Sequence, residues 1–199
     1  MQLVLVRHGE TTHNATRRIQ GWTDIPLNET GRSQARQLAA HLANKHFDAV
    51  YASPLQRAWE TAQIITAGNH PAPRREDRLK ETHYGIWENL SWEEVRERYP
   101  ETITAWQTDR NHTPSEAEPL SAFNARVADL WHTMQRDHTG QRVLLVGHGG
   151  SLRTLICVAL GIDPALRWNM AMKNTSVSEL ALDDTGPVLV RLNSTCHLQ

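Results

Sequence analysis

The stretch MQLVLVRHGETTHN, residues 1–14, combines a strand signal with a group of chemically active residues. Leu3 to Val6 is a short, wholly apolar run rich in β-branched residues, which predicts a strand buried on both faces. The run leads directly into Arg7, His8 and Gly9. Strands buried on both faces belong to parallel sheets, whose ligands bind beyond the carboxyl ends of the strands. The stretch therefore predicts an α/β fold with a site at the tip of its first strand.

Length and composition limit the function classes to be considered. The chain of 199 residues suits one α/β domain, and we expect residues 1–199 to form it, with a substrate-covering insertion at about 71–119. The formal net charge of -1 argues against nucleic acid or a membrane surface as the partner. No apolar run approaches the ~20 residues that span a bilayer. The absence of a leader-like start and of paired cysteine spacing favours a cytoplasmic protein.

Strand and helix signals alternate along the chain. Apolar periodicity predicts strands near residues 3–6, 47–53 and 142–147, a closing hairpin near 177–193, and helices near 33–45, 53–65, 120–134 and 151–162. Ser53 and Pro54 form a helix-start signature in which Ser53 is expected to be the N-cap. This order of elements predicts a three-layer α/β/α sandwich around a mostly parallel sheet.

Three of the predicted strands deliver unusual residues at their carboxyl ends. The first ends in Arg7 and His8, the second leads through a turn to Arg57, and the third ends in His148 between two glycines. Parallel strands bring these residues to one rim of the sheet. Guanidinium groups repel a metal ion, whereas they bind a phosphoryl group with two parallel hydrogen bonds. The sequence therefore predicts a phosphate pocket.

The same arrangement predicts a nucleophile. Nearby guanidinium charge lowers the pKa of a histidine, so the imidazole of His8 would be neutral and able to attack phosphorus. Helices that start after Gly9, Ser53 and Gly149 would add backbone N–H donors aimed at the anion. A carboxylic acid must protonate the departing alkoxide, but periodicity does not select it from the many glutamates.

Four motifs then occur in order: LVRHGET at 5–11, SPLQRAWETA at 53–62, RLKETHYGIWENLSWEEV at 78–95 and VGHGG at 146–150. With this set the chain resembles the histidine phosphatase superfamily, in its phosphoglycerate-mutase-like branch, over essentially its whole length. The resemblance implies a phosphoglycerate-mutase-like fold, no metal, no cofactor, and a small phosphorylated metabolite as the partner.

The resemblance also implies roles for single residues. His8 matches the phosphorylated nucleophile, and Glu81 matches the general acid that later activates water. The residues that match the phosphate pocket are Arg7, Asn14, Arg57, His148 and the backbone of Gly149. The residues at positions that contact the rest of the substrate are Gln20, Gly21 and Tyr84.

Among short members of the family, the length and the segment ENLSWEEV at 88–95 resemble α-ribazole phosphatases. The expected reaction is therefore metal-independent hydrolysis of α-ribazole 5′-phosphate through a phosphohistidine. The ending LNSTCHL at 192–198 resembles metal-independent phosphoserine phosphatases, in which a histidine is expected where Tyr84 stands. A phosphoserine or broad-specificity phosphatase, a phosphoglycerate mutase and an inactive phospho-ligand-binding protein stay open as alternatives, and so does a homodimer.

Two short segments depart from the family pattern. Gly-Gly-Glu-Ser is usual near the start of the long helix, where this chain has Glu116 to Pro119. Trp-Glu-Gly follows the acid in many members, where this chain has Trp87 to Asn89. Both departures bear on loop conformation in the expected insertion. Further residues that could line the cleft or meet the substrate are His83, His197, Trp22, Trp87, Arg17 and Arg18.

Overall fold

The computed structural model describes residues 1–109 and 112–198 and has a six-stranded sheet at its centre. The strands are β1 (Gln2–Arg7), β2 (Ala49–Ala52), β3 (Arg74–Arg75), β4 (Arg142–Gly147), β5 (Val177–Asp183) and β6 (Gly186–Ser194). Their order across the sheet is β3-β2-β4-β1-β5-β6. β1, β4, β2 and β3 run parallel, whereas β5 and β6 are antiparallel to their neighbours. The mostly parallel sheet and its closing hairpin are confirmed.

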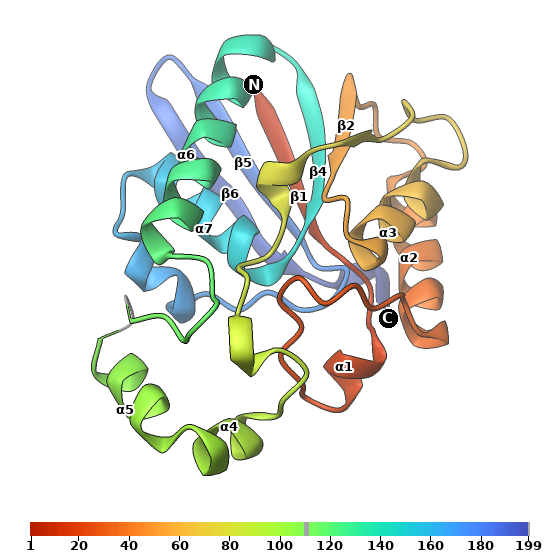
Figure 1. The fold of residues 1–199 in the computed structure, drawn as a ribbon. Helices are drawn as coiled ribbons and strands as arrows, with labels where there is room; N and C mark the ends of the chain where they lie inside the picture. The colour runs from red at the N-terminus through yellow and green to blue at the C-terminus, as the bar shows by residue number, and fades with distance from the viewer. Residues whose placement is uncertain (110–111, 199) are drawn as a thin grey trace.

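Helices cover both faces of this sheet, which confirms the three-layer sandwich (Figure 1). The helices are α1 (Thr12–Ala15), α2 (Glu29–Leu42), α3 (Gln56–Thr66), α4 (Trp92–Arg98), α5 (Pro100–Thr108), α6 (Leu120–Asp137) and α7 (Gly149–Leu160). Short 3-10 turns are η1 (Asp77–Leu79), η2 (Gly85–Trp87), η3 (Pro164–Asn169) and η4 (Cys196–Leu198). α2 and α3 cover one face, and α6 and α7 cover the other. In the described part of the chain, no helix has the length and apolarity that crossing a membrane requires.

The side chains of β1 alternate between the two cores. Leu3 and Leu5 are fully buried in the cluster that contains α6 and α7, whereas Val4 and Val6 pack in the cluster that contains α2 and α3. Each fully buried side chain of this size contributes roughly 1.5–3 kcal/mol to folding. Because a slip of one residue would exchange the two faces, this burial fixes the point at which His8 leaves the strand.

The loop after β1 is held against the start of α2 by two glycines. A Cβ added to Gly9 would lie 2.5 Å from the carbonyl oxygen of Gly31, and one added to Gly31 would lie 2.1 Å from that of Glu10. Neither backbone contact could be relieved by a side-chain movement. Asn28 caps α2 by accepting a hydrogen bond from the Gly31 N–H. The segment that carries His8 is therefore anchored at its far end by a helix N-terminus.

The expected start of the third helix is wrong. α3 begins at Gln56, and Ser53 does not cap it. The carboxylate of Asp24 instead accepts hydrogen bonds from the backbone N–H and the side-chain amide of Gln56. The capping group thus comes from a distant loop, which a local start signature does not reveal. At this N-terminus the Asp24 carboxylate therefore occupies the Gln56 N–H, one of the backbone donors that we expected for a phosphate.

The segment expected as an insertion contains a small core of its own. Its buried residues are Trp87, Val95 and Ile103, joined by Ile19 from the loop after α1. In Figure 1, α4 and α5 lie below the carboxyl ends of the parallel strands. The segment also supplies β3, a two-residue edge strand that the sequence did not predict.

Both departures from the family pattern have a left-handed backbone. Asn89 has φ 68° and Glu116 has φ 62°, at the two places where many relatives carry glycine. Asparagine tolerates this region better than other non-glycine residues, and glutamate does so with about 1–2 kcal/mol of strain. The loop conformation typical of glycine is therefore retained without it.

Candidate active site

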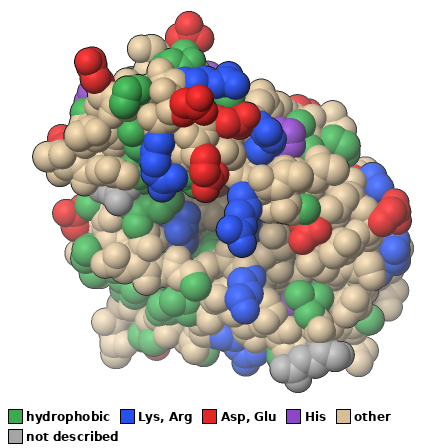
Figure 2. Space-filling model, turned by 90° about the horizontal axis from the view of Figure 1, so that it is seen from below, with side chains coloured by type: hydrophobic (Ala, Val, Ile, Leu, Met, Phe, Trp, Pro, Cys, Tyr) green, Lys and Arg blue, Asp and Glu red, His purple; other side chains and the backbone are tan. Residues whose placement is uncertain are grey.

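A cavity of about 380 Å³ opens where β1 ends. Eight of the residues predicted for the site line it: Arg7, His8, Asn14, Gln20, Gly21, Arg57, Glu81 and Tyr84. Seen from the side on which the parallel strands end, Lys and Arg side chains gather around a hollow (Figure 2). His148 is buried beside the cavity, with its ring centroid 5.1 Å from that of His8. The structure thus brings together residues that are up to 141 positions apart in sequence (148 minus 7).

His8 is held in one orientation and one tautomer. The residue is 3% exposed, and Nδ1 of its ring lies 2.7 Å from the carbonyl oxygen of Gly9. Because a carbonyl only accepts, Nδ1 carries the proton and Nε2 is left with a free lone pair. Burial, followed by the charges of Arg57 and Arg7, lowers the pKa of His8 well below its ordinary value. The ring is therefore neutral at physiological pH, and Nε2 is able to act as a nucleophile.

A loop before β5 also holds the His8 backbone. The side-chain amide of Asn174 donates to the carbonyl oxygen of His8 over 3.0 Å, and the backbone N–H of Thr175 donates to the carbonyl oxygen of Arg7. Sequence reasoning missed this loop because its residues carry no recognisable chemical motif and meet β1 only through a contact across the fold.

Arg7 and Arg57 are fixed by backbone carbonyls. Arg7 donates to the carbonyl oxygen of Met172, and Arg57 donates to those of Gly21 and Thr23. The Nε atoms of both arginines are buried with no hydrogen-bond partner among the described residues. Burial lowers the pKa of each guanidinium to about 10, so both keep their charge at neutral pH. The pair is preorganised to bind an anion with donors that are still unused.

His148 follows β4 directly and precedes the first residue of α7. Its Nε2 lies 2.8 Å from the hydroxyl oxygen of Ser53, whereas its buried Nδ1 has no hydrogen-bond partner in the part of the chain that the structure describes. Burial and the charge of Arg57 lower the pKa of His148 well below its ordinary value, as they do for His8. Gly149 opens α7, and a Cβ built on it would lie 3.7 Å from Nε of Arg7, so its backbone borders the same arginine.

The carboxylate of Glu81 is held by two backbone N–H groups. Its Oε2 accepts from Gly150 and its Oε1 accepts from Thr82, each over 2.9 Å. A Cβ on Gly150 would lie 2.0 Å from Oε1, so only glycine permits this approach. Glu81 is half-buried and lines the cavity with His8.

Arg126 organises the backbone around Glu81. Its guanidinium donates to the carbonyl oxygens of Arg78, Lys80 and Glu81, and it forms a bidentate ion pair with Glu118 at 2.6 and 2.8 Å. Glu118 belongs to the segment that departs from the Gly-Gly-Glu-Ser pattern but keeps its glutamate. Sequence reasoning missed the role of Arg126, since one arginine on a long helix has no distinctive spacing.

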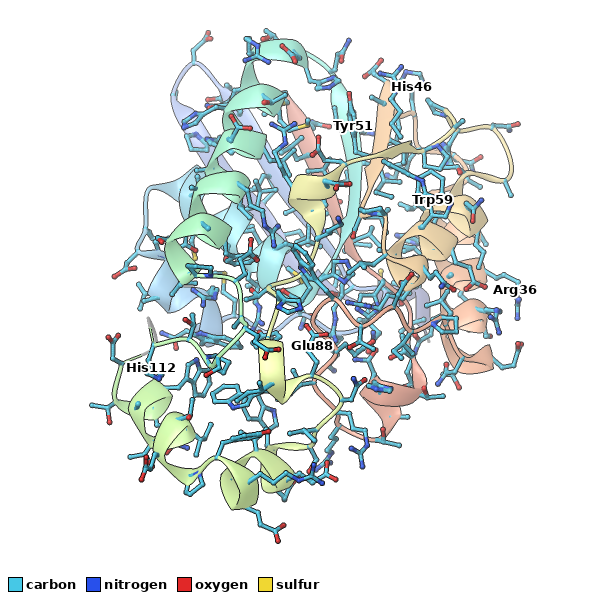
Figure 3. All side chains as sticks on the ribbon, viewed as in Figure 1. Arg36, His46, Tyr51, Trp59, Glu88 and His112 are labelled. Carbon is cyan, nitrogen blue, oxygen red and sulfur yellow. The ribbon has the colours of Figure 1, made fainter. Side chains whose placement is uncertain are left out.

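The role of Glu88 was also not predicted from the sequence. Its carboxylate accepts hydrogen bonds from the backbone N–H groups of Trp22, Thr23 and Tyr84 and from the Thr23 hydroxyl. It lies between the sandwich and the helices below it (Figure 3). A Cβ on Gly21, which has φ 52°, would lie 1.9 Å from Oε1 of Glu88. Glu88 therefore fixes the loop whose carbonyls hold Arg57.

The remaining predicted site residues differ in what they offer the cavity. Asn14 accepts from Thr11 and Asn174 through Oδ1, and within the described residues its Nδ2 has no acceptor. Gln20 is bound through Oε1 to the Thr11 hydroxyl. Burial and Glu81 raise the pKa of Tyr84, so its hydroxyl stays protonated. Asn14 and Tyr84 are thus possible donors to a substrate.

Of the two tryptophans expected to meet a substrate ring, burial rules out Trp87, whereas Trp22 is exposed but is not among the residues that line the cavity. Trp87 is fully buried in the small core, and Trp22 donates its Nε1–H to the carbonyl oxygen of Glu81. Trp92 and Trp168 line the cavity instead. Their place depends on how α4 and η3 pack, which the local sequence does not predict.

The other residues that were expected to line the cleft or meet the substrate differ in whether they reach the cavity. Arg18 pairs with Glu94 at 2.7 Å, whereas Arg17 lines the cavity without an ion pair among the described residues. His83 bonds to the carbonyl oxygen of Glu116 and lines a separate small cavity. His197 bonds to the Thr175 hydroxyl and is not among the residues that line the cavity. The expectation that these two histidines line the cleft is therefore wrong.

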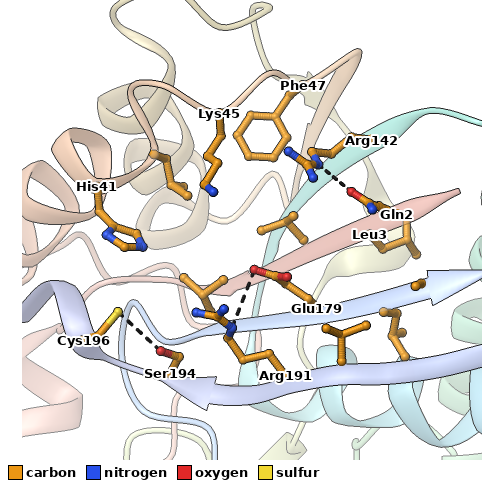
Figure 4. A pocket seen from close by; sticks show the side chains of 16 residues that line it. Gln2, Leu3, His41, Lys45, Phe47, Arg142, Glu179, Arg191, Ser194 and Cys196 are labelled. Carbon is orange, nitrogen blue, oxygen red and sulfur yellow. Dashed lines mark hydrogen bonds and ion pairs between the residues drawn. The ribbon is translucent and has the colours of Figure 1, made fainter.

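A second cavity, of about 310 Å³, lies between the end of α2 and the face of β5 and β6 (Figure 4). Its polar lining includes Lys45, Arg142 and an ion pair between Arg191 and Glu179. His41 is the one histidine among its described lining residues. The residues with phosphoryl-transfer chemistry therefore belong to the cavity at the end of β1, and not to this one.

The fold and the site together define a phosphatase, built from a neutral histidine beside two buried arginines and a carboxylate. The model of the histidine phosphatase superfamily (branch 1) matches residues 3–195, and the chain belongs to this superfamily. It is 34% identical to phosphoserine phosphatase 1 of Hydrogenobacter thermophilus, over 100% of this chain and 94% of that protein. It is 32% identical to adenosylcobalamin/alpha-ribazole phosphatase of Salmonella typhimurium, over 98% of this chain and 96% of that protein.

Comparison with a solved structure also places the chain among phosphatases of this fold. The chain superimposes with a TM-score of 0.92 and 29% identity on a putative alpha-ribazole-5′-P phosphatase from Escherichia coli, covering 98% of this chain and 97% of that one. Named relatives of the chain hydrolyse phosphate esters, and the chain is accordingly a phosphoric monoester hydrolase.

Proposed function

We propose that the protein is a metal-independent phosphomonoesterase that acts on a small phosphorylated metabolite through a phosphohistidine at His8. The observation that carries this proposal is the state of His8, which combines a free Nε2 lone pair, a lowered pKa and two adjacent guanidinium groups. A neutral imidazole beside fixed positive charge suits attack on a dianionic phosphoryl group.

The reaction follows in two displacements. In the first, Nε2 of His8 forms a bond to phosphorus while the bond from phosphorus to the ester oxygen breaks, and Glu81 gives its proton to that oxygen. In the second, the Glu81 carboxylate takes a proton from water, whose oxygen attacks phosphorus as the bond to Nε2 breaks. Inorganic phosphate leaves and His8 regains its lone pair. Arg7, Arg57, Asn14 and the Gly149 N–H bind the phosphoryl oxygens throughout.

The cavity favours a substrate whose leaving group carries a flat aromatic ring. The best candidate substrate is α-ribazole 5′-phosphate. Trp92 and Trp168 supply aromatic faces at the side of the cavity, and Tyr84 supplies a hydroxyl. Among the described residues that line the cavity, Glu81 is the one carboxylate, whereas Arg17 and Arg18 are cationic. A phosphoserine ammonium group would lack a negative partner apart from the proposed acid.

Phosphoserine is the second candidate substrate, because the chain is 34% identical over its whole length to phosphoserine phosphatase 1. The Arg17 guanidinium, which lacks an ion pair among the described residues, could bind the carboxylate of phosphoserine. The two esters make opposite demands on the lining of the cavity, so turnover separates them.

The test is phosphate release in EDTA from α-ribazole 5′-phosphate, phosphoserine, 3-phosphoglycerate and an aryl phosphate, with His8→Ala as the control. We expect turnover that EDTA leaves intact, that His8→Ala abolishes, and that is fastest for α-ribazole 5′-phosphate. Activity that disappears on chelation would contradict the metal-independent mechanism. Transfer of phosphate between the carbons of phosphoglycerate, without net release, would identify a mutase.

A further inference from the structure

Helices cover the closing hairpin of β5 and β6 on one face only. On the face that packs against α6 and α7, Leu180, Leu182 and Leu189 join the hydrophobic cluster of those helices. On the opposite face, Val177 is the one residue of the hairpin, among those described, that belongs to the cluster of α2 and α3. Val190 is accordingly 58% exposed. Most of this second face therefore extends beyond the cover that α2 provides.

The second cavity, of about 310 Å³, lies on this uncovered face. One side of it is formed by the end of α2 and the loop that follows, where Leu42 and Phe47 are 4% and 1% exposed. The other side is formed by the sheet, with Val4, Ala181 and Val190. Sites for small molecules have volumes of about 300–1,000 Å³ and are lined mainly by apolar side chains. The cavity therefore has the size and the apolar surface for one small ligand.

Positive charge surrounds this apolar surface. Lys45 and Arg142 line the cavity without an ion pair among the described residues, and the Arg142 guanidinium donates to the neutral amide oxygen of Gln2 over 2.7 Å. Glu179 is the one carboxylate among the described lining residues, and it approaches Arg191 at 3.8 Å. In Figure 4 the side chains of Lys45, Arg142 and Arg191 point into the space between α2 and the hairpin. Three cations face one carboxylate, which favours an anionic ligand.

We propose that this cavity is a second ligand site, which binds a small organic anion made of an apolar ring and a carboxylate. The ring lies against Ala181 and Val190, and the carboxylate accepts hydrogen bonds from Lys45 and Arg142, whose charges strengthen those bonds. The two cavities share no lining residue among those described. The inference therefore goes beyond the proposed function and does not depend on it.

The test follows the backbone amide signals by nitrogen-15 NMR while 2-naphthoate is added as the probe. We expect saturable shifts for amides that line the cavity, among them Lys45, Ala181 and Val190. The neutral probe 2-naphthylmethanol has the same ring, and its Kd should be at least about tenfold higher because it lacks the charge. Equal affinity for the two probes overturns the inference. Shifts confined to amides at the end of β1 would place 2-naphthoate in the reaction cavity and would overturn it as well.

Two variants change the cavity, and a third is the matched control. Lys45→Glu should raise the Kd of 2-naphthoate at least about tenfold, since a repulsion replaces an attraction. Arg36→Glu makes the same change of charge on α2, at an exposed residue that has no ion pair among the described residues and does not line the cavity. Its Kd should stay within about twofold of the wild-type value, because a charge outside the cavity is largely screened.

Ala181→Phe should abolish the saturable shifts, because its larger side chain fills the cavity. The amide spectrum of each variant shows whether the protein is folded. An unchanged Kd in folded Ala181→Phe protein overturns the inference. Shifts of the same amides that depend on protein concentration, in the absence of the probe, would show that a second copy of the chain covers this face and would also overturn it.

Discussion

His8 and His148 are both kept neutral by burial, and the charge of the same arginine, Arg57, adds to that effect. Burial first and Arg57 second lower the pKa of each histidine below its ordinary value of about 6.5. Neutral rings suit a pocket that is already positively charged, and they leave one lone pair for attack. This arrangement lowers the stability of the folded protein in acid.

We expect the free energy of unfolding to fall as the pH drops below about 6.5. There the unfolded chain binds protons at these histidines while the folded chain does not, so each contributes a limiting slope of about 1.4 kcal/mol per pH unit. The measurement is urea unfolding between pH 7.5 and 5 for the wild type and for His8→Asn. The variant should show a shallower slope, and equal slopes would contradict the buried neutral state.

Gly150 links the backbone of α7 to the position of Glu81. Replacement by alanine would put a Cβ 2.0 Å from Oε1 of Glu81 and force the carboxylate away. We expect Gly150→Ala to lower kcat about 100-fold, within the range for a displaced general acid. Stability should change little, because alanine favours the helix by up to about 1 kcal/mol over glycine.

The double variant Gly150→Ala with Glu81→Gln provides the control for this prediction. If both changes act on the same carboxylate, kcat of the double variant should be no lower than that of Glu81→Gln alone. A multiplicative loss would mean that Gly150 acts elsewhere, and a wild-type kcat in Gly150→Ala would contradict the steric argument.

Single residues also mark how far the sequence could predict the site. Arg7, His8, Arg57 and His148 could be placed because each follows a buried strand, and parallel strands end at one rim. Glu81 could be assigned through the family resemblance and not through periodicity, since it lies in an irregular segment. The sequence predicts that the Ser53 hydroxyl caps a local helix. In the fold this hydroxyl contacts His148, 95 positions away, and no local pattern encodes such a contact.

At the scale of elements, α6 holds the segment that carries Glu81. Arg126 on α6 binds three carbonyls of residues 78–81 and pairs with Glu118 (side-chain exposures 18% and 12%). Glu81, the proposed general acid, is thus supported by one helix and by the loop that precedes that helix. Local propensity predicted α6 well, yet it gave no sign of this task because the guanidinium reaches an irregular segment 45 or more positions away.

We expect Arg126→Met to lower both stability and activity. It leaves the Glu118 carboxylate and three carbonyls without their partner, at a cost of about 2–3 kcal/mol in the free energy of unfolding. It also frees the Glu81 backbone, so kcat should fall at least tenfold. Urea unfolding and steady-state kinetics measure the two effects.

Arg136→Met is the matched control on the same helix. Arg136 pairs with Asp137, and their side-chain exposures are 69% and 46%, so the free energy of unfolding and kcat should both stay at the wild-type level. Equal effects of the two substitutions would show that the Arg126 contacts do not support Glu81.

At the scale of the whole molecule, two parts of the chain supply the two sides of the cavity. The strand ends of the sandwich supply His8 and the arginines, whereas α4 supplies Trp92 and η3 supplies Trp168. The sandwich could be predicted because alternating elements with clear periodicity allow few topologies. The positions of the two tryptophans depend on the packing of short helices, for which the chain has no strong local signal.

This division predicts that Trp92→Ala changes substrate preference more than chemistry. Removal of an aromatic wall should raise KM for α-ribazole 5′-phosphate about tenfold, as expected for the loss of one stacking contact. KM for phosphoserine, which has no ring, should stay near the wild-type value and controls for folding. Trp92→Phe should restore most of the affinity for the aromatic ester. An equal rise of KM for both esters would contradict a stacking role.

The separation between the strand ends and the tryptophan wall has an evolutionary consequence. Selection can replace wall residues one at a time while the attacking histidine and its arginines stay untouched, so a lineage can exchange one metabolite for another without passing through an inactive ancestor. In its descendants the substrate specificity then changes faster than the residues that carry out the reaction. Whole-chain identity, at 34% to a phosphoserine enzyme and 32% to an α-ribazole enzyme, records common ancestry and ranks substrates poorly.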